Sequence, residues 1–151
     1  MEVIVLIGLP GSGKSTWASN YPCTGKKVVL ASDDDLIEPT TGVYWWTRER
    51  VDQAHKNVML QFIDHLQAED VDLVILDNTN TRLEFVAPYL FVASAFEVKV
   101  RLIHIKHDVR DSLARNRHGV NSGRHADMER NLTYMLEHWP EDFQPIEVVE
   151  I

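Results

Sequence analysis

The sequence predicts an α/β protein in which parallel strands and helices alternate along the chain. Short apolar runs alternate with longer segments in which apolar residues recur at helical spacing. Glycine-rich or acidic residues follow three of the runs, as expected where the carboxyl ends of parallel strands form a ligand crevice. The expected strands cover residues 1–7, 27–31, 71–77, 96–105 and 145–151, and the expected helices cover residues 14–20, 47–68, 81–95, 108–116 and 126–138.

Length and composition favour a single domain over residues 1–151. The chain is 44% apolar and 25% charged, which excludes a mostly disordered protein. The single cysteine, Cys23, has no partner for an internal disulfide, so we expect a reducing, cytoplasmic setting. The first apolar run carries Glu2 and lacks a basic leader, so it is interpreted as a strand and not a signal peptide. No apolar run approaches membrane-spanning length.

The first strand leads directly into a complete phosphate-binding loop, Gly8-Leu9-Pro10-Gly11-Ser12-Gly13-Lys14-Ser15-Thr16. Its glycines allow a tight bend, which turns the backbone amides of Gly11, Ser12, Gly13, Lys14, Ser15 and Thr16 toward a triphosphate. Lys14 supplies a cation for the β and γ phosphates, and the Ser15 hydroxyl is placed to ligate Mg²⁺. The following helix should end at Asn20, because Pro22 disfavours helix in the residue before it.

The second strand ends in an acidic run, Ser32-Asp33-Asp34-Asp35, on the same side of the sheet as the phosphate loop. One of these carboxylates could take a proton from an attacking hydroxyl, and another could hold a water of the magnesium shell. The alternative is helix capping by the serine and the aspartates, and both uses can coexist.

Residues 36–46 form a loop that ends in the aromatic residues Tyr44, Trp45 and Trp46. These rings could stack on a base, but packing into the core is the favoured interpretation. Thr47 is the expected N-cap of a long helix, with a buried stripe formed by Val51, Ala54, Val58, Phe62 and Leu66. His55 lies beside this stripe, either bonded in the core or pointing into the site.

The third strand is continuously apolar and ends at Asp77, the position at which a P-loop protein places a carboxylate near magnesium. Asn78-Thr79-Asn80-Thr81 follows, and this polar run could bind substrate or nucleotide or cap the next helix. Capping by Asn80 or Thr81 is expected in either case. Pro88 should kink or break that helix.

Positive charge is concentrated late in the chain, although the net charge is −8. Residues 99–130 contain eight basic and four acidic side chains, a local net charge of +4. Within this segment, residues 115–125 contain two glycines, three arginines (Arg115, Arg117 and Arg124) and no apolar period. They are interpreted as a mobile lid that brings an arginine to bound phosphates, and the alternative is a charged surface loop.

Taken together, these motifs resemble the kinase domain of phage polynucleotide kinases and related phage, bacterial and animal P-loop proteins. The resemblance is carried by Gly-Leu-Pro-Gly-Ser-Gly-Lys-Ser-Thr-Trp-Ala at 8–18, Ser-Asp-Asp-Asp at 32–35, Gly-Val-Tyr at 42–44, Ala-His-Lys-Asn at 54–57, Asp-Asn-Thr-Asn-Thr at 77–81 and Arg-Asn-Arg-His-Gly-Val at 115–120. It implies a three-layer P-loop NTPase fold like that of nucleoside monophosphate kinases, with five parallel strands in the order 2-3-1-4-5.

The resemblance also implies roles for individual residues. Asp34 corresponds to the catalytic acid and Arg117 to the lid arginine, with Arg115 near the nucleotide. ATP and Mg²⁺ are the implied cofactors, with Asp77 assisting Ser15 at the metal through water. The residues expected to contact the acceptor are Asp35, Thr79, Asn80 and Arg124.

Two positions depart from the family pattern. Ile37 stands where the phage enzymes have an arginine for the substrate phosphate, and the lid is one residue shorter. The leading hypothesis is a kinase for the 5′-hydroxyl of a DNA or RNA end. A small-molecule kinase, which would suit Ile37, is one alternative, and a P-loop ATPase or nucleotide-binding switch without an acceptor is another.

Overall fold

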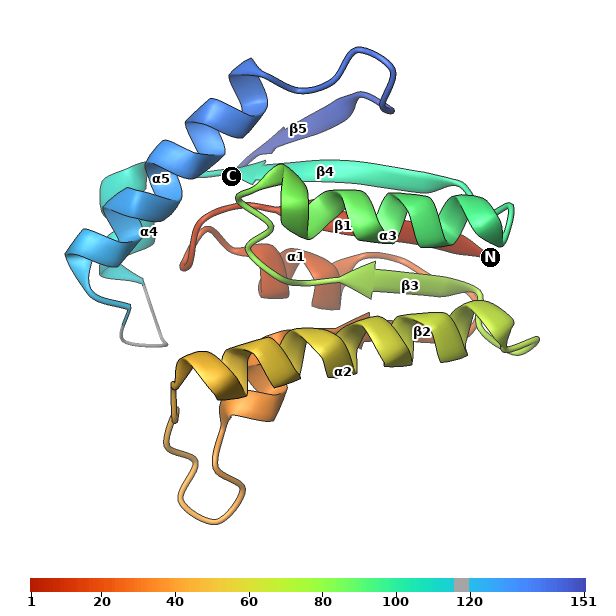
Figure 1. The fold of residues 1–151 in the computed structure, drawn as a ribbon, viewed down its shortest axis with the longest axis horizontal. Coiled ribbons are helices and arrows are strands. Elements are labelled where there is room, and N and C mark those ends of the chain that lie inside the picture. The colour runs from red at the N-terminus through yellow and green to blue at the C-terminus, as the bar shows by residue number, and fades with distance from the viewer. Residues whose placement is uncertain (116–119) are drawn as a thin grey trace.

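The computed structural model describes residues 1–115 and 120–151, and its centre is one parallel sheet. The strands are β1 (Glu2–Ile7), β2 (Lys27–Leu30), β3 (Leu73–Leu76), β4 (Val100–Lys106) and β5 (Ile146–Glu150). Their order in the sheet is β2-β3-β1-β4-β5, and every neighbouring pair is parallel (Figure 1). The predicted fold class and strand order are therefore confirmed.

Helices cover both faces of this sheet. They are α1 (Lys14–Asn20), α2 (Arg48–Gln67), α3 (Leu83–Ala95), α4 (Val109–Ala114) and α5 (Ser122–Glu137), with a 3₁₀ helix, η1, at Ser32–Leu36. Figure 1 shows α2 and α3 in front of the sheet and α1 behind it. No helix in the described ranges is both long and apolar enough to cross a membrane.

The central strand β1 divides the hydrophobic core into two layers, because alternate side chains of a strand point to opposite faces. Val3, Val5 and Ile7 pack with residues of α2, α3 and α5. Ile4 and Leu6 pack with residues of α1 on the other face. All five side chains are fully buried, so the strand holds the phosphate loop that follows it on a rigid support.

Helix α2 forms as the sequence predicts. The Thr47 hydroxyl accepts a hydrogen bond from the Arg50 amide at 3.2 Å, which satisfies one of the free donors of the first turn. Four members of the predicted stripe, Ala54, Val58, Phe62 and Leu66, are buried. The fifth, Val51, is half-buried and lines the cavity described below.

Two helix starts differ from prediction. Helix α3 begins at Leu83 with Arg82 at its N-cap, so the predicted capping by Asn80 or Thr81 is wrong, and the helix continues through Pro88. Helix α5 begins at Ser122, within the segment interpreted as a lid. Its N-cap is Asn121, whose side-chain oxygen accepts from the Arg124 amide at 2.8 Å. The cap starts this helix before the apolar period begins.

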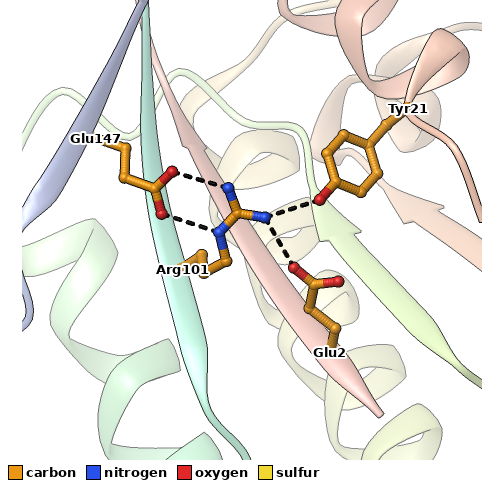
Figure 2. A network of polar contacts seen from close by, with 4 residues as sticks. All are labelled: Glu2, Tyr21, Arg101 and Glu147. Atoms are coloured by element: carbon orange, nitrogen blue, oxygen red, sulfur yellow. Dashed lines mark hydrogen bonds and ion pairs between the residues drawn. The ribbon is translucent and has the colours of Figure 1, made fainter.

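A network around Arg101 ties together β1, β4, β5 and the residue that follows α1 (Figure 2). The guanidinium donates two hydrogen bonds of 2.8 Å to the Glu147 carboxylate. It also donates to Glu2 at 3.0 Å and to the Tyr21 hydroxyl at 2.7 Å. These contacts raise the pKa of Arg101 further above its already high value. One side chain therefore joins parts of the chain that are distant in sequence.

Candidate active site

A cavity of about 520 Å³ lies where the phosphate loop, η1 and the residues after β3 meet. Its volume is in the range of small-molecule binding sites. The lining residues are Pro10, Gly11, Gly13, Lys14, Ser15 and Thr16 from the phosphate loop and α1; Ser32, Asp33, Leu36, Tyr44, Trp46, Val51 and His55 from η1, the loop after it and α2; Asp77, Asn78 and Thr79 after β3; and Arg115, Val120, Asn121, Arg124 and Met128.

The phosphate loop has the backbone geometry that its glycines predict. Gly11 and Gly13 have φ values of 80° and 95°, which side-chain-bearing residues rarely adopt. A Cβ atom on Gly11 would collide with the Ser112 carbonyl oxygen of α4. The Gly8 amide donates to the Thr79 carbonyl at 2.9 Å, which anchors the start of the loop to the segment after β3.

Lys14 is held inside the loop. Its Nζ donates to the Leu9 carbonyl at 2.9 Å, and the residue is only 7% exposed. Burial lowers the pKa of Lys14 to about 8, against the attraction of the Asp77 and Asp33 carboxylates, which acts to raise it. A bound triphosphate would supply the negative charge that this buried ammonium group lacks.

Asp77 and Ser15 form a pair suited to hold Mg²⁺. Asp77 is 9% exposed, and burial raises the pKa of its carboxyl group, while a hydrogen bond from the Ser15 side chain acts to lower it. Within the described part of the chain, Asp77 Oδ1 is buried and receives no hydrogen bond. A hydroxyl beside a buried carboxylate oxygen with spare bonding capacity is the donor set that a hard cation prefers. The residues present therefore fit the ion.

The three aspartates of the acidic run differ in position. Asp33 is half-buried, lines the cavity and accepts a hydrogen bond from the Tyr44 hydroxyl at 3.3 Å. Asp34 is exposed and does not line the cavity. The pKa of Asp77 is raised mainly by the burial of Asp77 and to a smaller extent by the Asp34 charge. Asp35 is exposed, and its carboxylate accepts from the Asn57 side chain at 2.9 Å. The structure thus brings Asp33, the member that the sequence did not single out, to the cavity wall.

The polar run after β3 is used in three ways. Thr79 lines the cavity, and its role as a substrate contact stays a prediction. The Asn78 side-chain oxygen accepts from the Ser32 amide at 2.8 Å and from the Ser32 hydroxyl at 2.9 Å, which fixes the start of η1. Asn80 is 2% exposed and does not line the cavity. Its amide donates to the Leu6 carbonyl at 2.7 Å, so the structure uses it to support β1.

Two described arginines, Arg115 and Arg124, line the cavity. Arg115 also lines a neighbouring hollow of about 350 Å³ together with Gly13, Thr16 and Ile151. Arg124 lies with its guanidinium carbon 3.8 Å from the centre of the Trp46 ring. Arg117, the predicted lid arginine, lies outside the described residues.

The aromatic residues before α2 do not pack into the core, so the favoured sequence interpretation was wrong for them. Trp45 and Trp46 are 54% and 43% exposed, and Tyr44 and Trp46 line the cavity. His55 is half-buried, lines the cavity and stacks on Phe85 with ring centres 5.7 Å apart. The three adjacent aromatics of the sequence were the available signal for this wall.

The fold and the phosphate loop define a P-loop kinase-like nucleotide-binding protein. A family model described as an AAA domain matches residues 3–138, so the chain belongs to that family. The predicted resemblance to polynucleotide kinases is also confirmed.

Two curated relatives extend this assignment. NEDD4-binding protein 2 of Homo sapiens is 27% identical over 143 residues, which cover 92% of this chain and 8% of that protein. The bifunctional polynucleotide phosphatase/kinase of Schizosaccharomyces pombe (strain 972) is 30% identical over 106 residues, which cover 70% of this chain and 21% of that protein. The chain therefore spans only a small part of the length of these relatives.

Solved structures agree on the fold. The structure of the Pnkp1/Rnl/Hen1 RNA repair complex contains a chain with a TM-score of 0.72 and 21% identity, and the match covers 97% of this chain and 48% of that one. A gluconokinase from Sinorhizobium meliloti has a TM-score of 0.60 and 14% identity, covering 99% and 82% of the two chains. A chain of an RNA repair complex and a gluconokinase therefore share this architecture.

Proposed function

We propose that this protein transfers the γ-phosphate of ATP to the 5′-hydroxyl of a DNA or RNA end. The observation that carries the proposal is that one cavity combines the phosphate loop, the Ser15–Asp77 pair, an aspartate and two arginines. This is the set of groups that phosphoryl transfer needs for positioning and charge neutralisation. The polynucleotide phosphatase/kinase relative supports a nucleic-acid acceptor.

The phosphate loop positions the donor in this mechanism. The backbone amides of residues 11–16 donate to the phosphate oxygens, and Lys14 leaves its bond to the Leu9 carbonyl to contact the β and γ phosphates. Ser15 and Asp77 would hold Mg²⁺. When bound, the ion offsets charge on the phosphates during transfer. Arg115 neutralises charge at the nucleotide, and Arg117 keeps the catalytic role that the family resemblance implies.

A carboxylate of the acidic run accepts the proton of the attacking hydroxyl. The family resemblance assigns this role to Asp34, which we adopt. Thr79 and Arg124, which line the cavity, are proposed acceptor contacts. Asp33 is the competing assignment, because it is the aspartate that lines the cavity. Loss of a general base lowers the rate by about 10²- to 10⁴-fold, so Asp34→Asn and Asp33→Asn can be ranked by their residual transfer.

A small-molecule acceptor is the second candidate. Ile37, at the position of the family's substrate-phosphate arginine, is 38% exposed and offers no charge to a nucleic-acid phosphate. The gluconokinase fold neighbour adds an example of such an acceptor on this architecture.

A panel of acceptors separates the candidates. The protein is incubated with Mg²⁺, γ-labelled ATP and each of 5′-hydroxyl DNA, 5′-hydroxyl RNA, nucleosides and sugar acids, with Lys14→Ala as the control for contaminating kinases. We expect label on an oligonucleotide and none with Lys14→Ala. Label only on a small metabolite would replace the first proposal by the second. Release of phosphate without any labelled acceptor would contradict both.

A further inference from the structure

The cavity that contains the phosphate loop also has an aromatic wall. This wall is formed by Tyr44 and Trp46, which precede α2, together with Leu36, Val51 and Met128. Trp46 is 43% exposed and lines the cavity, unlike the exposed rings of Phe85, Phe91 and Tyr134. Trp46 therefore offers ring surface to a ligand instead of closing the core.

Trp46 is also part of a polar cluster that connects this wall to the reaction centre. The Arg124 guanidinium lies over its ring at 3.8 Å, which is a cation–π arrangement of two planar groups. Tyr44, two residues before Trp46, donates to Asp33 at 3.3 Å, and the Asp33 charge attracts Lys14 in the phosphate loop. A ligand that rests on Trp46 thus occupies the same cavity as Asp33 and the phosphate loop.

A nucleobase fits this arrangement by its chemistry. It is planar and can stack on an indole ring, and the neighbouring guanidinium can contact the phosphate on the 3′ side of the same nucleotide. A sugar acid or polyol has no planar face to offer. Stacking on an aromatic ring also tolerates any base, because every base has a π face.

We propose that Trp46, assisted by Arg124, is the stacking platform for the 5′-terminal base of the acceptor strand. This inference rests on the proposed function and names its acceptor subsite. The enzyme then binds the first nucleotide more tightly when it carries a base, whichever base that is.

The chain supplies its own control in Trp45. This neighbouring tryptophan is 54% exposed and does not line the cavity. The guanidinium carbon of Arg50 lies 4.6 Å from the centre of its ring. Trp45→Ala therefore removes an exposed indole of the same loop without touching the proposed subsite. Trp46→Phe keeps an aromatic face and reports whether a loss in Trp46→Ala comes from the ring or from misfolding.

The test is equilibrium binding of a single-stranded oligonucleotide with a free 5′-hydroxyl and a 3′ fluorophore, measured by anisotropy without ATP. A second oligonucleotide is identical except for an abasic first nucleotide. We expect Trp46→Ala to raise the Kd for the intact oligonucleotide about 10-fold, the effect of losing one base–aromatic stack, while Trp45→Ala stays within about 2-fold. The abasic change should cost the wild type about 10-fold and cost Trp46→Ala almost nothing, because both changes remove the same contact.

The inference is overturned if the abasic penalty is equal in wild type and Trp46→Ala, if both alanine variants lose affinity equally, or if the wild type binds neither oligonucleotide. Running γ-labelled ATP in parallel separates this inference from the proposed function. Trp46-dependent binding without transfer would refute the kinase proposal and leave the base platform intact. Transfer that does not depend on Trp46 would refute the base platform and leave the kinase proposal intact.

Discussion

Replacing Asn80 by alanine should destabilise the protein without weakening the binding of the phosphoryl acceptor. The Asn80 side chain is 2% exposed, and its amide is bonded at 2.7 Å to the Leu6 carbonyl at the end of the central strand. Loss of this bond leaves a buried acceptor unsatisfied, at a cost of about 1–3 kcal/mol. Asn80 also has a φ of 50°, where alanine is less favourable by about 1–2 kcal/mol. The expected loss of unfolding free energy for Asn80→Ala is therefore about 2–5 kcal/mol.

Thermal unfolding measures this loss directly. For a chain of this size, about 1 kcal/mol corresponds to about 2–4 °C, so the Tm should fall by roughly 4–20 °C. Asn80→Gly is the matched control, because glycine adopts the positive φ and this variant loses only the hydrogen bond. Its Tm should lie between those of the wild type and Asn80→Ala. Urea denaturation of the same three proteins should give the same ranking.

The opposite outcome would return Asn80 to the substrate. If Asn80→Ala keeps the wild-type Tm and raises the KM for the acceptor alone, the side chain acts in substrate binding, as the sequence predicted. A fall in Tm with an unchanged acceptor KM at low temperature supports the structural role.

Three further predictions concern the loop, its lysine and the strand network. Gly11→Ala should raise the KM for ATP and destabilise the fold, because Gly11 has a φ of 80° and an added Cβ would meet the Ser112 carbonyl. Gly42→Ala is the control. Gly42 has a φ of 67°, but an added Cβ would meet no described atom within 4 Å, so this change should destabilise the fold only slightly. Because the pKa of Lys14 is lowered to about 8, the free enzyme loses this positive charge as the pH rises through 8, and kcat/KM for ATP should fall above that pH. The kcat should persist, since bound phosphates keep Lys14 protonated. A kcat/KM profile that stays flat to pH 10 would contradict the burial of Lys14. Arg101→Met should lower the stability by about 1–2 kcal/mol, because it removes a bidentate ion pair and two further bonds from a half-exposed network, and this loss should shrink in high salt.

The fold was predictable because local patterns determine it. Each strand is a short apolar run next to a glycine, an acid or a turn, and the Thr47 cap and the stripe of α2 are visible in the residues themselves. The phosphate loop is equally local, since nine consecutive residues carry its glycines, lysine and hydroxyls. These features needed no knowledge of distant contacts.

The errors occur where a distant contact decides the outcome. Asn80 has the composition of a cap or a substrate ligand, but its partner is Leu6, which is 74 residues away. The start of α5 depends on one cap at Asn121, in a stretch without an apolar period. Trp46 lines the cavity and lies against Arg124, which is 78 residues away, so local pattern does not show that it stays out of the core. Local pattern cannot distinguish between these uses of the same residue types.

The central claim is that the γ-phosphate goes to the 5′ end of a nucleic acid. It is tested most directly by comparing two oligonucleotides that differ only in carrying a 5′-hydroxyl or a 5′-phosphate, each incubated with γ-labelled ATP and wild-type protein. We expect labelling of the first alone, with the label removed by a phosphatase that acts on terminal phosphates, and labelling by Asp34→Asn that is about 10²- to 10⁴-fold slower. Equal labelling of both oligonucleotides, or ATP hydrolysis with neither labelled, would contradict it.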